Sequence, residues 1–243
     1  MKFLTLTVAL LAGLSAAYAI DYTNEIINAV PVSGGLSGEG HHTGYWDCCK
    51  PSCAWTGNAY TDPPVRGCAA DGVTTVDKEL QSGCASDGGS YSCTDQVAHA
   101  ANKSFALGFT AASFTGGTDY SMCCRCVLLT WKYDTQDPKR QILVQITNTG
   151  GDLLSNQFDL AIPGCGVGYV ADGCTNQWGA PVGGWGQQYG GVSTEEECSE
   201  LPEELQVACQ FRFEWMDVPD WTVDFVEVEC PTALTDISQC IIS

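Results

Sequence analysis

The fifteen cysteines restrict the folds open to this chain of 243 residues more than any other feature. They run from Cys48 to Cys240 and are spread over that whole stretch. In an exported protein, cysteines at this density form a disulfide framework. Zinc is the alternative, but the clusters CCKPSC and CCRC do not repeat a C-x-x-C pair, and the chain has only three histidines. We therefore expect disulfides, with one cysteine left over because the count is odd.

The N-terminal sequence MKFLTLTVALLAGLSAAYA predicts export. Lys2 supplies a charged start, residues 3–14 are apolar, and Ala17-Tyr18-Ala19 has the small-x-small form of a cleavage site. The apolar run is too short and too early to span a membrane. We expect a signal peptide over residues 1–19, a flexible Gly/Ser-rich lead-in over 20–40, and one domain over 41–243 that is secreted and extracellular.

The charge of the chain limits its partners. Twenty-nine acidic residues against ten basic ones give a formal net charge of −19. Such a surface repels nucleic acid and anionic membranes, so neither is expected as a partner. It suits a neutral or cationic substrate, although solubility alone also accounts for it.

Periodic patterns predict a mainly β protein. Five segments are β-branched or aromatic and partly alternating: 104–114, 126–133, 141–149, 211–215 and 222–230. Helices are expected over 94–102 and over 194–209, the latter with Ser193 and Glu196 as a capping box and an interruption at Pro202. Strands joined by long glycine-rich loops, above all 163–191, indicate a compact β-barrel.

Carboxylates are the best candidates for chemistry. No nucleophile elbow, phosphate-binding loop or zinc-protease motif occurs. His41 and His42 lie beside the expected lead-in and His99 lies in an expected helix, so we do not expect acid–base catalysis by histidine. Asp47 lies among three cysteines in YWDCCKPSC, Asp159 lies in a short apolar segment, and Asp152 follows two glycines. A carboxyl among apolar neighbours can serve as a general acid. Taken singly, however, an aspartate in a loop is more often a cap or a turn former.

A set of longer motifs resembles glycoside hydrolase family 45, the secreted endoglucanases (cellulases) that cut β-1,4-glucan internally. The set begins with TGYWDCCKPSCAW and SGCASDGGSYSCTDQ and continues with FALGFTAASF, CCRCVLLT, TNTGGDLLSNQFDLAIPGCGVG, DGCTNQWG, QQYGGVST and VEVECP. They occur in a consistent order from residue 43 to about residue 240. The resemblance implies a six-stranded double-psi β-barrel with long disulfide-stapled loops, a few short helices and an open groove.

The resemblance also implies a role for each candidate residue. Asp47 would be the general base that activates a water molecule, Asp159 the general acid that donates a proton, and Asp152 an assisting residue. Tyr45 would contact substrate, and Trp55 would be an aromatic platform for sugar. Such an enzyme inverts the anomeric configuration and needs no metal or other cofactor. The expected partner is a β-1,4-glucan polysaccharide such as cellulose, and the protein is expected to act as a monomer.

Seven disulfides follow from the same resemblance. The implied pairs are Cys48–Cys174, Cys49–Cys84, Cys53–Cys123, Cys68–Cys93, Cys124–Cys240, Cys126–Cys230 and Cys198–Cys209. Cys165 is left over, where the family usually has glycine. A second departure is Gln157, because many fungal members have histidine there. Glutamine can form hydrogen bonds but cannot carry the charge.

Three other interpretations compete with a cellulase. Expansin-like proteins share the barrel but lack an aspartate equivalent to Asp47. The same site could act on another polysaccharide, such as lichenan, glucomannan or chitosan. A disulfide-rich structural or inhibitor protein would have neither a groove nor paired carboxylates.

Overall fold

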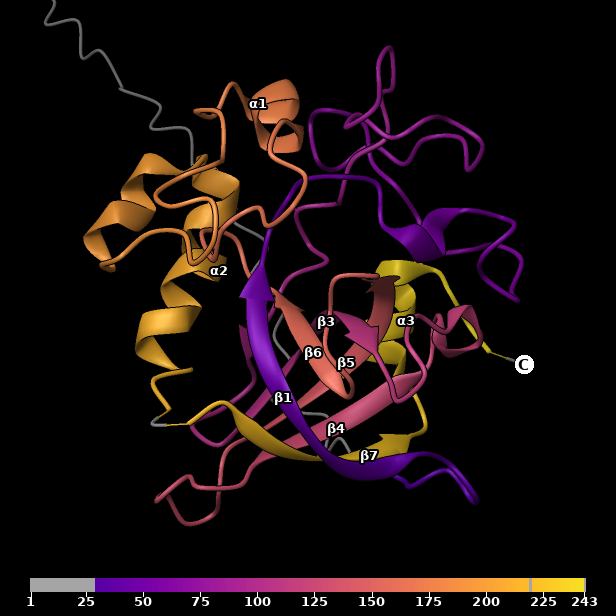
Figure 1. Cartoon of the computed structure of the whole chain (residues 1–243), viewed down its shortest axis with the longest axis vertical. Coiled ribbons are helices and arrows are strands. Elements are labelled where there is room, and N and C mark those ends of the chain that lie inside the picture. Colours follow the sequence, from indigo (N-terminus) through magenta and orange to yellow (C-terminus); the bar gives the residue numbers. More distant parts are fainter. Residues whose placement is uncertain (1–28, 219, 243) are drawn as a thin grey trace, which may run out of the picture.

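The computed structural model describes residues 29–218 and 220–242, in which six strands close a barrel (Figure 1). The predicted signal peptide and the lead-in up to residue 28 lie outside the described residues. Around the barrel the order is β3 (Phe105–Ser113), β5 (Gln141–Thr149), β4 (Cys126–Trp131), β7 (Thr222–Val228), β1 (Ser37–Tyr45) and β6 (Gln157–Ala161). Pairing of β6 with β3 closes the ring, and β1–β6 and β3–β5 are parallel. The predicted double-psi barrel is confirmed.

Strand β1 corrects the prediction for the lead-in. Residues 37–40 do not form a flexible segment but pair with β7, from Ser37 opposite Val226 to Gly40 opposite Val223. Glycines are needed here because a neighbouring backbone and aromatic rings occupy the space beside the strand. A Cβ atom on Gly40 would lie 2.3 Å from the backbone oxygen of Asn156 and 3.1 Å from the ring of Phe158. These glycines therefore provide room for packing inside a strand.

Both faces of the barrel wall are buried along β3 and β5. Along β5, Ile142, Val144 and Ile146 belong to one apolar cluster, whereas Leu143 belongs to a second cluster that includes Leu205 of the helix α2 (Glu203–Glu214). Alternation of this kind follows from the two-residue period of a strand. It explains why β3, β4 and β5 have nearly continuous apolar sequences, which made these strands predictable.

Two predictions of secondary structure were wrong. The segment 211–215 is not a strand, because α2 continues to Glu214 and stacks the rings of Phe211 and Trp215 at 5.1 Å, the i, i+4 spacing of a helix. The segment 94–102 is not a helix, because it contains the short strand β2 (His99–Ala100), which pairs with β3. The interruption at Pro202 is confirmed, since the 3₁₀-helix η3 (Glu196–Glu200) ends before it. The carboxylate that accepts from the Ser193 N–H belongs to Glu197, not to Glu196.

The remaining helices are short and lie in the loops. They are the 3₁₀-helices η1 (Ser52–Ala54) and η2 (Tyr120–Met122) and the α-helices α1 (Gly173–Trp178) and α3 (Thr232–Ser238). Figure 1 shows α1 and the loops that follow β1 gathered above one end of the barrel. This end carries the candidate site. No described helix is long and apolar enough to cross a membrane.

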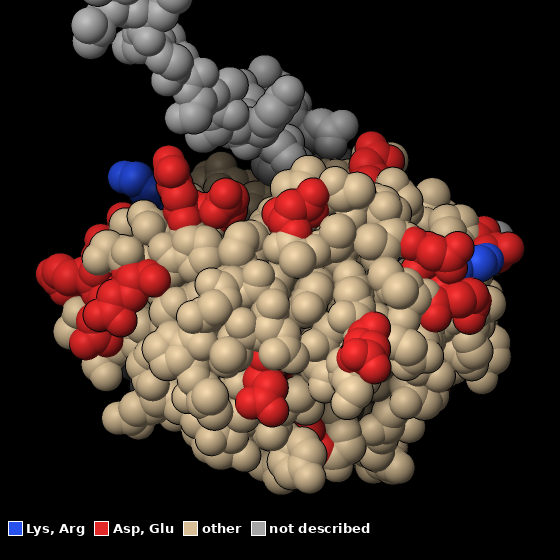
Figure 2. Space-filling model, turned by 90° about the horizontal axis from the view of Figure 1, so that it is seen from above, with Lys and Arg blue, Asp and Glu red and all other residues tan. Residues whose placement is uncertain are grey.

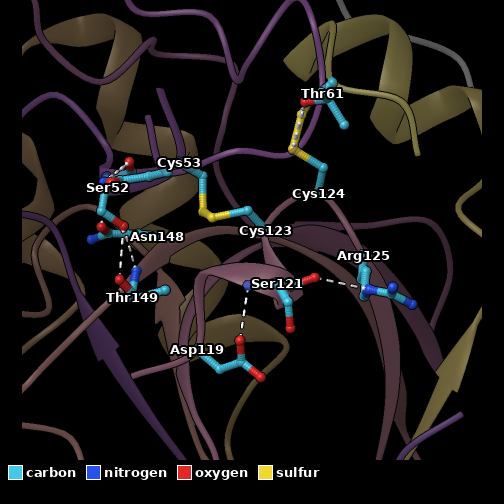
Figure 3. The surroundings of a disulfide bond; sticks show 12 residues. Ser52, Cys53, Thr61, Asp119, Ser121, Cys123, Cys124, Arg125, Asn148 and Thr149 are labelled. Atoms are coloured by element: carbon cyan, nitrogen blue, oxygen red, sulfur yellow. Dashed lines mark hydrogen bonds between the residues drawn. A yellow bond between two sulfur atoms is a disulfide. The ribbon is translucent and has the colours of Figure 1, made fainter. Parts of the chain in front are cut away.

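All seven disulfides implied by the resemblance are present. Cys165 is free and buried. Figure 3 shows how Cys53–Cys123 joins the segment after β1 to the segment before β4, with Ser52 hydrogen-bonded to Asn148 and Thr149 at the end of β5. The loops above the barrel are therefore fixed to it covalently and by hydrogen bonds.

The disulfide framework gives a simple expected result. Titration with a thiol reagent in denaturant should detect one thiol per chain, that of Cys165, because the other fourteen cysteines are paired. Without denaturant the same reagent should react slowly, because Cys165 is only 6% exposed and burial raises its pKa to about 12. Three or more reactive thiols in denaturant would contradict the seven-bridge framework.

The surface has the acidic character expected from the composition. On the face shown in Figure 2, acidic side chains are scattered over the molecule and gather toward its edges, with few basic ones between them.

Candidate active site

A groove over one end of the barrel holds every candidate residue. Its first part has a volume of about 380 Å³, and its lining includes Tyr45, Asp47, Trp55, Asp152 and Asp159. The adjoining part has a volume of about 510 Å³ and shares Tyr45, Asp152 and Asp159 with the first. Because both parts share these residues, they form one continuous groove with the carboxylates in its middle. A structural or inhibitor protein without a groove is therefore ruled out.

Asp47 lies just beyond β1 in a covalently fixed segment. Disulfides join Cys48 to α1 and Cys49 to Cys84, and Cys48 has a left-handed backbone with φ of 64°. This conformation is unfavourable for a residue other than glycine and persists where its surroundings impose it. The Cys49 N–H donates to Asp47 Oδ1 at 2.9 Å, which orients the carboxylate. The segment therefore holds Asp47 in one place.

Burial controls the protonation of Asp47. Loss of solvation raises its pKa to about 6, with a further contribution from the negative charge of Asp152. The hydrogen bond from Cys49 acts in the opposite direction, because it favours the ionised form. Asp47 is consequently ionised at neutral pH but remains a stronger base than an ordinary aspartate.

Asp159 is placed by the pairing of β6 with β1. Thr43 lies opposite Asp159 in the parallel register, and its hydroxyl donates to Asp159 Oδ1 at 2.6 Å. Gln157 Nε2 donates to Thr43 Oγ1 at 2.9 Å, while Gln157 Oε1 accepts from the Leu154 N–H at 2.8 Å. Gln157 thus orients the Thr43 hydroxyl toward Asp159.

The surroundings of Asp159 let it hold its proton to a higher pH than Asp47 does. Burial raises its pKa to about 7, the bond from Thr43 lowers it, and the charges of Asp152 and Asp47 raise it. The side chain of Asp152 is exposed in the loop before β6 and lines both parts of the groove. Its charge therefore acts on both carboxyls at once.

Tyr45 lines the same part of the groove as the two carboxylates, and the charges of both act on its hydroxyl. Asn148 Nδ2 donates to the Tyr45 hydroxyl at 2.9 Å, and Asn148 Oδ1 accepts from the Ser52 N–H. Burial and the charge of Asp47 raise the Tyr45 pKa well above its ordinary value, so the hydroxyl stays neutral. It can donate a hydrogen bond to a ligand because its contact with Asn148 leaves the proton free.

Trp55 lines the part of the groove that contains Asp47, and a lysine supports its ring. The ammonium of Lys50 lies 3.5 Å from the ring centroid and donates to the carbonyl oxygens of Lys78 and Leu80. A cation over one ring face is a favourable contact that orders the indole. Neither Lys50 nor Thr43 was among the candidates from sequence, because their roles depend on contacts across the fold.

The geometry combines one carboxyl that is ionised near neutral pH with one whose pKa lies higher, in an open groove with aromatic walls. Two carboxyls whose pKa values differ are what acid–base hydrolysis of a glycosidic bond requires. Among the described residues, no group of three metal-ligating side chains lies together. The sequence profile of glycosyl hydrolase family 45 matches residues 39–241.

The chain belongs to glycosyl hydrolase family 45.

Relatives support this assignment along nearly the whole length. An endoglucanase of Phaedon cochleariae is 46% identical over 243 residues, covering 99% of each chain. An endoglucanase of Cryptopygus antarcticus is 48% identical over 214 residues, covering 87% of this chain and 93% of the other. The crystal structure of a cellulase from the same springtail superposes with a TM-score of 0.79 at 48% identity, covering 86% of this chain and 99% of that one. The predicted family 45 endoglucanase is confirmed.

Proposed function

We propose that this family 45 endoglucanase cuts internal β-1,4 bonds of cellulose-type glucans with inversion at the anomeric carbon. The observation that carries the proposal is the pair Asp47 and Asp159, which line one groove with pKa values raised to about 6 and about 7. An expansin-like protein without catalysis is disfavoured by Asp47 and its three-cysteine surroundings. Hydrolysis by this pair needs no cofactor.

The proposed mechanism assigns one step to each carboxyl. Protonated Asp159 donates to the glycosidic oxygen as the bond to the anomeric carbon breaks. Ionised Asp47 removes a proton from a water molecule that attacks the opposite face of the same carbon. Inversion requires the two carboxyls to lie roughly 6.5 to 9.5 Å apart, so that the water fits between them. Asp152 assists by raising the proton affinity of both groups, while Tyr45 and Trp55 bind the glucan.

The stereochemistry of the product tests the proposal. With carboxymethyl cellulose, viscosity should fall well before many reducing ends appear, because internal cuts shorten chains quickly. Proton NMR of freshly released cello-oligosaccharides should show the α-anomer first. Initial β-anomer would indicate retention and a different mechanism, and a loss of viscosity without new reducing ends would favour the expansin-like interpretation.

The pH dependence should reflect the two carboxyls as a pair. The active form has Asp47 ionised and Asp159 protonated, so kcat/KM should rise as pH passes about 6 and fall as it passes about 7. In Asp152→Asn both the rising and the falling limb of the pH profile of kcat/KM should move to lower pH. The reason is that a negative charge that raises the pKa values of Asp47 and Asp159 has been removed. Limbs that stay in place in this variant would exclude an electrostatic role for Asp152.

We also propose that the protein is secreted and acts as a monomer. Seven disulfides are typical of proteins that fold in an oxidising compartment, which supports secretion. Size-exclusion chromatography of the mature protein, with light scattering, would test the monomeric state.

A further inference from the structure

The groove does not stop at the carboxylates on the side away from Trp55. The part lined by Tyr45, Asp159 and Arg212 shares His42, Arg212 and Met216 with a third hollow of about 730 Å³. Phe213, Asp217, Asp220 and Trp221 line this hollow as well. The groove therefore continues past Asp159 for a further stretch, and its outer end carries a tryptophan.

Trp221 has the features of a fixed platform. Its side chain is 51% exposed, which is high for so large an apolar group. The ring of His41 stacks on it with centroids 4.6 Å apart and planes at 25°. The Trp221 carbonyl accepts from the His42 N–H at 2.9 Å, which ties the residue to β1 just before β7 begins. The indole is thus held in place while about half of its surface faces solvent.

The same arrangement occurs at the opposite end of the groove. There Lys50 covers one face of Trp55, and here His41 covers one face of Trp221. In each case a neighbour orders the ring and leaves surface free for a ligand. An ordered aromatic ring binds the C–H face of a pyranose at little entropic cost, because its side chain has only two rotatable bonds.

We propose that Trp221 is a sugar-binding platform for the leaving-group side of a β-1,4-glucan chain. The direction follows from the carboxyls, and the inference therefore rests on the proposed function. Asp159 protonates the oxygen of the departing sugar. The hollow with Trp221 adjoins the part of the groove that Asp159 lines and Asp47 does not, whereas Trp55 and Asp47 line the other part. The glucan fragment that leaves with a new non-reducing end would extend over Trp221. Asp217 and Asp220 line the same hollow and can accept hydrogen bonds from sugar hydroxyls.

Cleavage of cellohexaose labelled at its reducing end tests the platform. The labelled product is the fragment bound on the Trp221 side. Trp221→Ala should shift the cut toward the label, giving shorter labelled products, and should lower kcat/KM for the hexamer by about 5- to 10-fold. Trp221→Phe should retain most of the wild-type pattern. The matched control is Tyr60→Ala, which removes an aromatic side chain that is 79% exposed and lines none of these hollows.

A second variant guards against misfolding. His41→Ala removes the support of the indole and should shift the pattern in the same direction as Trp221→Ala, with thermal unfolding measured for each protein. An unchanged cleavage pattern and unchanged kcat/KM in folded Trp221→Ala would overturn the platform.

Binding separates this inference from the proposed function. Calorimetric titration of cellohexaose into Asp159→Asn, with and without Trp221→Ala, needs no turnover. If the wild type fails to cut the hexamer, the proposed function fails, but weaker binding in the double variant would still support the platform. Equal binding in the two proteins would overturn the platform whatever the activity.

Discussion

Asp159→Asn should lower kcat on cellulosic substrates by about 10²- to 10⁴-fold, because an amide cannot protonate the leaving sugar oxygen. The fold should be unaffected, since asparagine can still accept from the Thr43 hydroxyl that contacts Asp159 at 2.6 Å. The measurement is the initial rate of reducing-end release under saturating substrate. Asp236→Asn is the matched control, because Asp236 is exposed on α3 and does not line the groove.

A substrate with a better leaving group can show whether Asp159 is the proton donor or only shapes the site. An aryl cellobioside with a very acidic phenol needs little protonation as it departs, so Asp159→Asn should lose much less activity on it than on cellulose. An equal loss on both substrates would mean that Asp159 is not the proton donor. Near-normal turnover of cellulose would remove it from the mechanism.

Asp47→Asn should be equally inactive on cellulose but should not recover with the activated substrate. The attacking water needs its base whatever the leaving group, so the loss should be about 10²- to 10⁴-fold on both substrates. KM should change little, because the amide keeps the shape of the side chain and can still accept from the Cys49 N–H. The two variants together therefore assign the base and the acid independently.

Recovery of Asp47→Asn on the activated substrate would contradict this assignment, since it would give Asp47 the role of the acid. Far-UV and near-UV circular dichroism of both variants should match the wild type. A change in the near-UV spectrum of Asp47→Asn would show that the substitution disturbs aromatic or disulfide packing and does not act on the chemistry alone.

The sequence predicted the parts of the fold whose signals are local. Strands β3, β4, β5 and β7 have β-branched and aromatic runs, and the motifs around Asp47 and Asp159 are long enough to identify a family. The start of β1 was not predicted, because its glycines and serine give this segment the composition of a flexible linker. Only the positions of Phe158 and Asn156 explain why glycine is needed there.

The supporting contacts of the site could not be predicted, because their partners lie far apart in the chain. Gln157 and Thr43 are 114 residues apart, and the contact between them appears only when β6 lies beside β1. Trp221 belongs to none of the recognised motifs, and its stacking on His41 depends on the meeting of β7 with β1. Segment 211–215 shows the converse error, because a short alternating run fits a helix as well as a strand.

The parallel register of β1 and β6 has a consequence for how such an enzyme could change its chemistry. Thr43 faces Asp159 in that register, and Asp47 follows four residues later on the same chain. Deleting one residue between Thr43 and Asp47 would turn the base to the other side of the chain, because successive side chains of an extended segment alternate. The separation of Asp47 from Asp159, which the proposed mechanism needs in order to admit water, is therefore set by strand alignment and by the number of residues after Thr43. Under the proposed mechanism, the anomer that such an enzyme releases therefore depends on backbone alignment as well as on the catalytic side chains.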